Sequence, residues 1–236
     1  MKEKHNLDEY LKTHFIHRSN WLRAAVLGAN DGILSTASIA IGVSAASTTR
    51  QPIILATLAG LVAGALSMAA GEYVSVSSQT DIEKADIERE RQELEEMPEE
   101  ELQVLAQIYE NRGLKKETAL QVAEELTAHD ALAAHVRDEL GINEMSKANP
   151  IQAALASGAS FVFGGILPLL VVFLLPLKTM ELYIYAFSII FLAILGAVSA
   201  KTGGAKIMNS VVRITFWGTI AMGITALIGY LFGINL

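Results

Sequence analysis

The sequence contains no cysteine among its 236 residues. This absence excludes disulfides, thiolate-ligated zinc, iron–sulfur clusters and thiol nucleophiles. Charged residues are also scarce: they make up 18% of the chain, whereas a typical soluble domain carries about 25%. Hydrophobic residues instead reach 52%. The composition therefore argues against an ordinary soluble domain and indicates membrane-embedded segments.

The few charges are unevenly distributed along the chain. Residues 81–147 hold 19 of the 25 acidic residues and 8 of the 18 lysines and arginines, which gives this segment a net charge of −11. The rest of the chain carries +4. Because a strongly negative segment is repelled by phosphate backbones, we expect no nucleic-acid partner.

Long apolar runs dominate the remainder of the chain. Five of them approach the roughly 20 residues that a helix needs to cross a bilayer. They cover residues 24–46, 52–76, 153–177, 182–200 and 214–232. The first run exceeds the roughly 7 to 15 residues of a signal-peptide core and lacks a small-residue cleavage site, so we expect it to be retained.

These runs predict an all-α membrane protein. It has five transmembrane helices in a lipid bilayer and an acidic cytoplasmic helical domain inserted between spans two and three. We divide the chain into an N-terminal segment (1–22), spans one and two (23–79), the acidic domain (80–149) and spans three to five (150–236).

Cations in the short loops predict the orientation in the membrane. The first 23 residues contain five lysines and arginines, and Lys201, Lys206 and Arg213 lie between or beside spans four and five. The opposite loops offer only Arg50 and Lys178. By the positive-inside rule, the N-terminus and the acidic domain are cytoplasmic and the C-terminus lies on the other side.

The first two spans carry polar residues that need an explanation. A carboxylate such as Asp31 costs about 2.5 to 3.5 kcal/mol inside a bilayer unless it is paired, hydrated or protonated. We interpret Asp31 as part of an ion path; the alternative is a neutral side chain bonded to Ser35 or to a neighbouring helix. Met68 lies at a similar depth, about 12 to 14 Å inside the membrane, although such a residue can also simply face lipid or fill the core. Glu72 follows one turn later on the same face.

Ligand counting predicts a homodimer. One Asp, one Met and one Glu cannot fill a coordination shell of about six, whereas a two-fold axis along the first span doubles every ligand. We therefore expect the ion path at a subunit interface. The pairs Gly28/Gly32 and Gly60/Gly64 permit close helix approach, which packing within one chain would also explain.

The acidic domain reads as a series of helices. We expect the second span to continue as a helix out of the membrane, followed by three further helices and a Pro at the return to the membrane. The expected landmarks are a helix end near Glu96, a second helix from Pro98 to Gly113, a third from about Lys115, a fourth from near Asp130 to Gly141, and re-entry at Asn149-Pro150.

The first cytoplasmic helix carries acids where an apolar seam is normal. The three-and-four spacing is occupied by Glu83, Asp86, Glu90, Glu93, Met97 and Glu100. Like charges at this spacing repel each other, so either a cation binds to these carboxylates or water simply solvates this face of the helix. Downstream, the one-turn pairs His135/Glu139 and Glu125/His129 could each supply a metal ligand or be ordinary surface pairs.

Three features together resemble the vacuolar iron transporter family. They are Asn30-Asp31-Gly32 in the first span, the segment 66–73 (LSMAAGEY) at the end of the second, and the Glu-rich extension that follows. The likeness extends over essentially the whole chain from Trp21. The resemblance implies a dimer of five-span subunits that moves ferrous and related divalent ions out of the cytosol in exchange for protons.

The resemblance also implies roles for individual residues. Asp31 and Met68 match the intramembrane metal residues of the family. The positions that match its cytoplasmic carboxylate ligands are Glu90, Glu93, Glu101 and Glu139. We add Glu72 as a carboxylate on the route between the two sites.

Some positions depart from the plant members of that family. Val104 stands where the plant pattern has another Glu, and His135-Val136 stands where it has two methionines. Glu72 replaces a glycine. His135 could substitute as a nitrogen ligand, and Glu100 could compensate for the missing carboxylate.

We expect a transporter rather than an enzyme. The sequence has no HExxH motif, GxSxG elbow or P-loop, and we expect no prosthetic group. Carboxylates with a thioether favour Fe2+ and Mn2+, followed by Co2+ and Zn2+. The alternative is a membrane-anchored module that buffers metal or recruits a basic protein. The short polar ends favour a bacterial plasma membrane, where the protein would export metal, over a vacuolar membrane.

Overall fold

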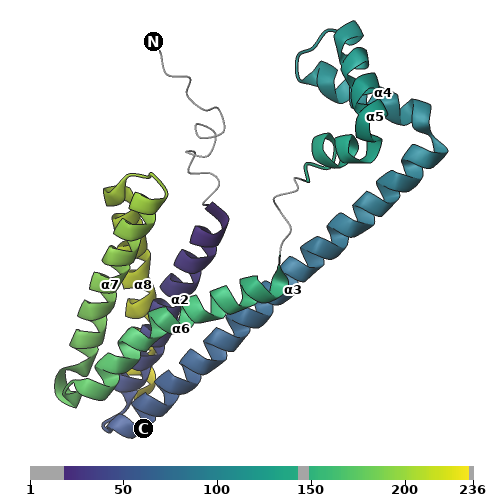
Figure 1. The fold of residues 1–236 in the computed structure, drawn as a ribbon. Helices are drawn as coiled ribbons and strands as arrows, with labels where there is room; N and C mark the ends of the chain where they lie inside the picture. The colour runs from purple at the N-terminus through teal and green to yellow at the C-terminus, as the bar shows by residue number, and fades with distance from the viewer. Residues whose placement is uncertain (1–18, 143–148, 234–236) are drawn as a thin grey trace, which may run out of the picture. The chain divides into compact units, whose positions relative to one another are not determined.

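The computed structural model describes residues 19–142 and 149–233. These residues form seven α-helices and one short 3-10 helix, with no strand among them (Figure 1). The chain divides into two compact units. The membrane unit comprises Met1–Tyr73 and Ile151–Leu236, and the acidic unit comprises Val74–Pro150.

Five helices are long and apolar enough to cross a membrane, which confirms the five predicted spans. Residues 1–18 of the expected N-terminal segment lie outside the described residues. The five helices are α2 (Ser19–Ala46), α3 (Arg50–Glu96), α6 (Pro150–Leu174), α7 (Met180–Thr202, preceded by the 3-10 helix η3, Leu177–Thr179) and α8 (Ile207–Gly233).

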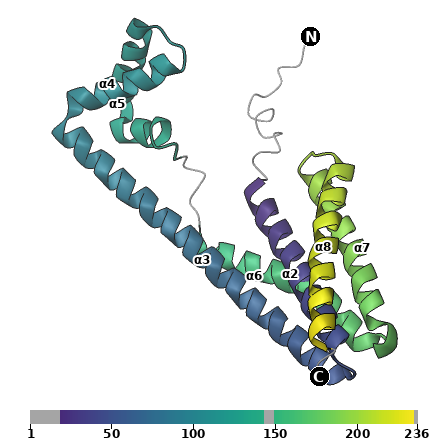
Figure 2. The same cartoon turned by 180° about the vertical axis from the view of Figure 1, so that it is seen from behind.

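Helices α2, α7 and α8 lie side by side in both views (Figures 1 and 2). Their buried core includes Ile33, Ala37 and Ile41 of α2, Ile184 and Leu192 of α7, and Met222 of α8. Elsewhere these helices and α3 present bare apolar side chains, such as Leu66 on α3 and Trp217 on α8. Apolar faces of this kind suit contact with lipid chains.

Glycines bring α2 and α6 into backbone contact. A Cβ built on Gly32 would lie 2.1 Å from the carbonyl oxygen of Phe161, and one on Gly164 would lie 2.1 Å from that of Ala29. Gly64 of α3 abuts the Phe161 ring. Of the two interpretations of the glycine pairs, packing within one chain therefore accounts for Gly28, Gly32, Gly60 and Gly64.

Arg50, at the first residue of α3, caps another helix. Its guanidinium donates hydrogen bonds to the carbonyl oxygens of Phe173, at 2.8 Å, and Leu175. These carbonyls belong to the C-terminal end of α6, where a helix dipole favours a cation. The N-terminal end of α3 and the C-terminal end of α6 therefore lie together, as alternating transmembrane helices require.

The acidic unit follows the predicted series of helices. Its elements are the last part of α3, ending at Glu96, then α4 (Pro98–Asn111) and α5 (Lys116–Asp138). Helix α5 is kinked at Asp130, whose φ of −163° and ψ of 93° are not helical. The Asp130 carboxylate accepts a hydrogen bond from the Ala133 amide at 2.9 Å, so it caps the second half. The predicted third and fourth helices are thus the two halves of α5.

A small apolar core joins α4 to α5. Its buried members are Leu105, Ala106, Ala123 and Ala134, with Leu102 and Tyr109 packed against them. Gly113 and Gly141 have φ values of +101° and +68°, which favour glycine where a helix ends. The landmarks predicted for these helix ends are confirmed.

Candidate metal centre

Four potential ligands gather inside the acidic unit. Glu90 comes from α3, Glu101 from α4, and His135 and Glu139 from α5. One ligand atom from each residue can be chosen so that all four lie within 4.8 Å of one another. All four residues were candidate ligands in the sequence analysis. Only His135 and Glu139 are one helical turn apart, so the other two reach the cluster through the packing of the helices.

Local structure explains how three helices reach one point. Pro98 occupies the first turn of α4, and the chain reverses around Met97, so Glu101 stands in the first turn of α4 beside the end of α3. The positive end of a helix dipole favours a carboxylate there. His135 and Glu139 are four residues apart and therefore share a face of α5.

The imidazole of His135 lies at the focus of the three carboxylates. Its Nδ1 atom is 2.9 Å from Glu90 Oε1, 2.9 Å from Glu139 Oε2 and 3.7 Å from Glu101 Oε2. The His135 side chain is fully buried, and Glu90 and Glu101 are only 3% and 7% exposed. Because Nδ1 carries at most one proton, it cannot donate to both close oxygens. Its hydrogen bond goes to Glu139.

Two buried polar atoms of the centre are left without a hydrogen bond among the described residues. They are Oε1 of Glu90 and Nε2 of His135. Glu90 Oε1 lies within 2.9 Å of the ring nitrogen without hydrogen-bonding geometry, so we regard this contact as electrostatic. Unsatisfied buried polar atoms are costly, and a ligand is one common explanation for them.

Burial raises the pKa of Glu90, and the neighbouring carboxylate of Glu139 raises this pKa further, against the opposing influence of His135. Burial likewise raises the pKa of Glu101. Three carboxylates thus compete for a single imidazole. A divalent cation coordinated by the four side chains would offset this repulsion and satisfy the oxygen ligands.

Glu93 lies beside this cluster rather than within it. Its side chain is 36% exposed and its Oε1 atom is 3.7 Å from Arg89 Nε. An exposed pair of this kind is weak. Glu93 still adds negative charge around Glu90 and Glu101. Its position suits an outer carboxylate on the approach to the centre.

The other acidic positions differ in exposure. Glu100 is exposed, as expected if its charge is simply solvated by water, whereas Glu90 is buried. Glu125 and His129 are both exposed, as expected for an ordinary surface pair.

The three candidates in the membrane unit have separate surroundings. Asp31 is half-buried, and its Oδ1 accepts a hydrogen bond of 3.1 Å from the Ser35 hydroxyl. This contact is the one foreseen by the alternative interpretation of Asp31. Met68 packs against the apolar cluster that contains Phe161. Glu72 is half-buried one turn further along α3.

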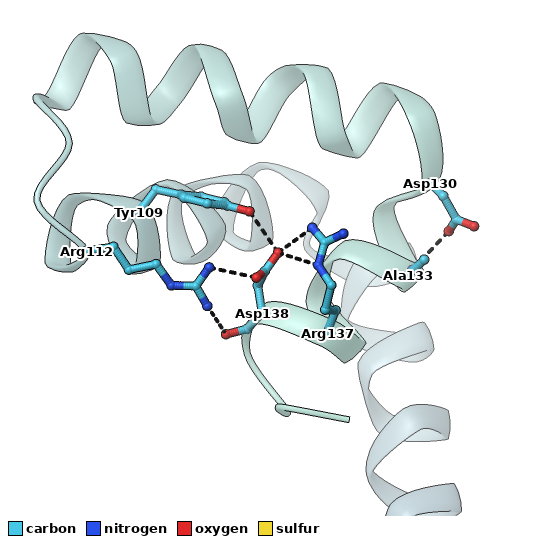
Figure 3. A network of polar contacts seen from close by, with 6 residues as sticks. All are labelled: Tyr109, Arg112, Asp130, Ala133, Arg137 and Asp138. Carbon is cyan, nitrogen blue, oxygen red and sulfur yellow. Dashed lines mark hydrogen bonds and ion pairs between the residues drawn. The ribbon is translucent and has the colours of Figure 1, made fainter. Parts of the chain in front are cut away.

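A polar clamp that the sequence did not reveal holds α5 beside α4 (Figure 3). The Asp138 carboxylate accepts hydrogen bonds from Tyr109, Arg112 and Arg137, at distances of 2.7 to 2.8 Å. Burial alone would raise the pKa of Asp138, but these three donors lower it to about 2. Asp138 directly precedes Glu139, so the clamp fixes the end of α5 that carries two of the four ligands.

We expect Asp138→Asn to loosen this part of the acidic unit. Because a carboxyl pKa lowered from 3.8 to about 2 represents stabilisation of the charged form, the loss should be about 2 kcal/mol. Amide hydrogen exchange in α4 and α5 measures this loss as roughly 30-fold faster exchange at pH 7. The exposed Glu124→Gln is the matched control. Equal protection in Asp138→Asn and the parent would contradict the role of the clamp.

Five membrane-length helices and an acidic helical unit with clustered carboxylates define a polytopic membrane protein that carries a candidate metal centre. The model of the VIT family matches residues 22–230, and the chain belongs to this family.

Named relatives support the assignment. The chain is 48% identical over 214 residues to a vacuolar iron transporter of Acanthamoeba castellanii, covering 90% of this chain and 79% of that protein. It is 38% identical over 223 residues to vacuolar iron transporter homolog 1 of Oryza sativa subsp. japonica, covering 94% and 78%. It is also 36% identical over 217 residues to homolog 2 of Arabidopsis thaliana, covering 90% and 86%.

Proposed function

We propose that this protein transports ferrous iron, and with it Mn2+, Co2+ or Zn2+, out of the cytosol in exchange for protons. The observation that carries the proposal is the cluster of three carboxylates, two of them buried, around the buried His135 in a chain of the VIT family. A relative at 48% identity is named a vacuolar iron transporter. Five membrane-length helices give the chain the means to form a path.

In this proposal the acidic unit is cytoplasmic and collects the ion. Glu93 attracts it, and the cluster of Glu90, Glu101, His135 and Glu139 binds it. The ion then passes Glu72 and reaches Asp31 and Met68 before it leaves on the opposite face. This orientation rests on the positive-inside rule. Arg50, one of the two cations on the opposite side, has a separate structural role, because it caps the C-terminal end of α6.

Proton exchange follows from the chemistry of the ligands. A carboxylate must lose its proton to bind a metal, and an imidazole nitrogen must be unprotonated. Metal and proton therefore compete for the same atoms. If the competition occurs at sites that face the two sides alternately, the inward proton gradient drives metal outward.

We propose that the intramembrane path lies at the interface of a homodimer. Residues spaced three or four apart on α2 form a half-buried polar stripe, Asp31, Ser35 and Ser38, beside the exposed Leu27. In lipid, a half-exposed carboxylate is costly. A second copy facing this stripe would cover it and double the ligands. Transport by a protein that stays monomeric after reconstitution would contradict this arrangement.

Flux across liposomes tests the proposed function. The purified protein is reconstituted, and uptake of Fe2+, Mn2+ and Zn2+ is followed with an internal metal-sensitive dye, with and without an imposed proton gradient. We expect uptake that accelerates when the lumen is acidic and that alkalinises the lumen as metal enters. Metal binding without flux would favour the anchored buffering module, and flux independent of pH would exclude proton exchange.

A further inference from the structure

We propose that His135 sets the metal selectivity of the centre. Its imidazole supplies one nitrogen among three carboxylates, so the centre favours Co2+ and Fe2+ over Mn2+ and rejects Ca2+. This inference rests on the proposed function, because it takes the cluster to be a metal site.

The geometry around His135 differs from that of a structural histidine. A structural imidazole typically has one hydrogen-bond partner at each ring nitrogen, but here Nδ1 faces three carboxylates and Nε2 has no partner among the described residues. Glu90 Oε1 lies 2.9 Å from Nδ1 and still lacks a hydrogen bond. An ion held between an unprotonated Nδ1 and the carboxylate oxygens would replace the Nδ1–Glu139 hydrogen bond and engage Glu90 Oε1, with the single imidazole proton then on Nε2.

The fold fixes the ring in this position. His135 is fully buried, so its ring has little freedom to turn away from the carboxylates. The cap at Asp130 sets the start of the second half of α5, and the clamp at Asp138 fixes its end. His135 and Glu139 are thereby held on one face of a short, doubly anchored helix.

The kind of donor atom determines which metal ions the centre prefers. Carboxylate oxygens suit Ca2+, Mg2+ and Mn2+, whereas imidazole suits the later transition metals. Affinity for divalent ions generally rises from Mn2+ through Fe2+ to Co2+, and a nitrogen donor accentuates that order. Replacing the nitrogen by oxygen should therefore change the ranking of the metals as well as the strength of binding.

The test compares metal affinities of the full-length protein in detergent. His135→Glu converts the centre to four carboxylates, and His135→Gln removes the nitrogen at similar size. His129→Glu, an exposed histidine on the same helix, is the matched control. Dissociation constants for Co2+, Mn2+ and Ca2+ come from competition with a fluorescent chelator.

We expect the ratio of Mn2+ to Co2+ dissociation constants to fall at least about tenfold in His135→Glu, a size typical of losing a group that supports a metal site. In this variant, binding of Mn2+ should persist and binding of Ca2+ should become stronger than in the parent, because the centre then offers oxygen donors alone. His135→Gln should weaken Co2+ more than Ca2+, and His129→Glu should match the parent. An unchanged ratio in variants that still bind metal would overturn the role of His135.

A measurement on the parent protein tests the same inference without any substitution, in case the variants fail to fold. With Mn2+ bound and histidine labelled with 15N, pulsed electron paramagnetic resonance should detect the coupling of one directly coordinated imidazole nitrogen. Bound Mn2+ without this coupling would overturn the inference while leaving the proposed function intact. Failure of the parent to bind any of the three ions at the centre would instead contradict the proposed function itself.

Discussion

Asp31→Ala is expected to reduce metal flux in proteoliposomes to that of protein-free vesicles. In our proposal Asp31 is the carboxylate of α2 that binds the ion within the membrane and carries the competing proton. Its loss leaves the path without that charge. Removing a carboxylate from a span also relieves an insertion cost of about 2.5 to 3.5 kcal/mol, so the variant should still insert and fold.

Two comparisons separate loss of the ion site from loss of the fold. Asp31→Asn keeps the size of the side chain and can still accept the Ser35 hydrogen bond, yet it should also be inactive because it carries no charge. Glu181→Gln, at an exposed position in the first turn of α7, should transport like the parent. Full flux through Asp31→Ala would exclude Asp31 from the path.

The double variant Glu90→Ala with Glu93→Ala should chiefly weaken capture of dilute metal. Glu90 is a buried member of the centre and Glu93 a half-buried carboxylate beside it. Losing both should raise the half-saturating metal concentration by about 10- to 100-fold, the range typical for damage to the surroundings of a metal site. The maximal rate should change much less, because the intramembrane residues remain. Initial rates over a range of Fe2+ concentrations measure both quantities.

The two glutamates differ in burial, so their single substitutions should have different effects. Glu90→Gln alone should reproduce most of the effect, whereas Glu93→Gln should have a smaller one, because its side chain is partly solvated and pairs weakly with Arg89. Glu95→Gln, an exposed acid on the same helix, is the control. Equal effects of all three substitutions would mean that general negative charge, rather than the centre, captures the ion.

Local signals in the sequence were sufficient to predict the helices. Pro98 opens α4, Gly113 and Gly141 adopt positive φ after helices, and Asp130 caps the second half of α5. Each feature depends on residues that are close along the chain, and each residue type favours the observed conformation for a local reason. The apolar runs predicted the five spans in the same way.

The arrangement of the centre depends on contacts that are distant in sequence. Spacing alone paired His135 with Glu139, and the acidic seam pointed to Glu90, but only the family resemblance singled out Glu101. The full burial of His135 among three carboxylates could not be predicted from the sequence, because this burial depends on how α3, α4 and α5 pack. The clamp could not be predicted for the same reason, because Asp138 lies 26 residues from Arg112 and 29 residues from Tyr109 in the sequence.

The two proposed metal sites differ in chemistry, and this difference suits their tasks. The centre in the acidic unit offers three carboxylates and an imidazole, of which Glu90, Glu101 and His135 are buried, and this favours selective capture. The intramembrane site offers one carboxylate and one thioether per chain, which favours weaker binding and release. Transport requires both properties, because an ion that is held tightly throughout cannot leave.

Whether Asp31 binds the transported ion can be seen in a density map of the protein with bound Mn2+. We expect an anomalous peak about 2.2 Å from the Asp31 carboxylate, a typical metal–oxygen distance, and no such peak in Asp31→Ala. A map in which both Asp31 oxygens are satisfied by Ser35 and other fixed side chains, sealed from water and without a metal peak, would contradict it.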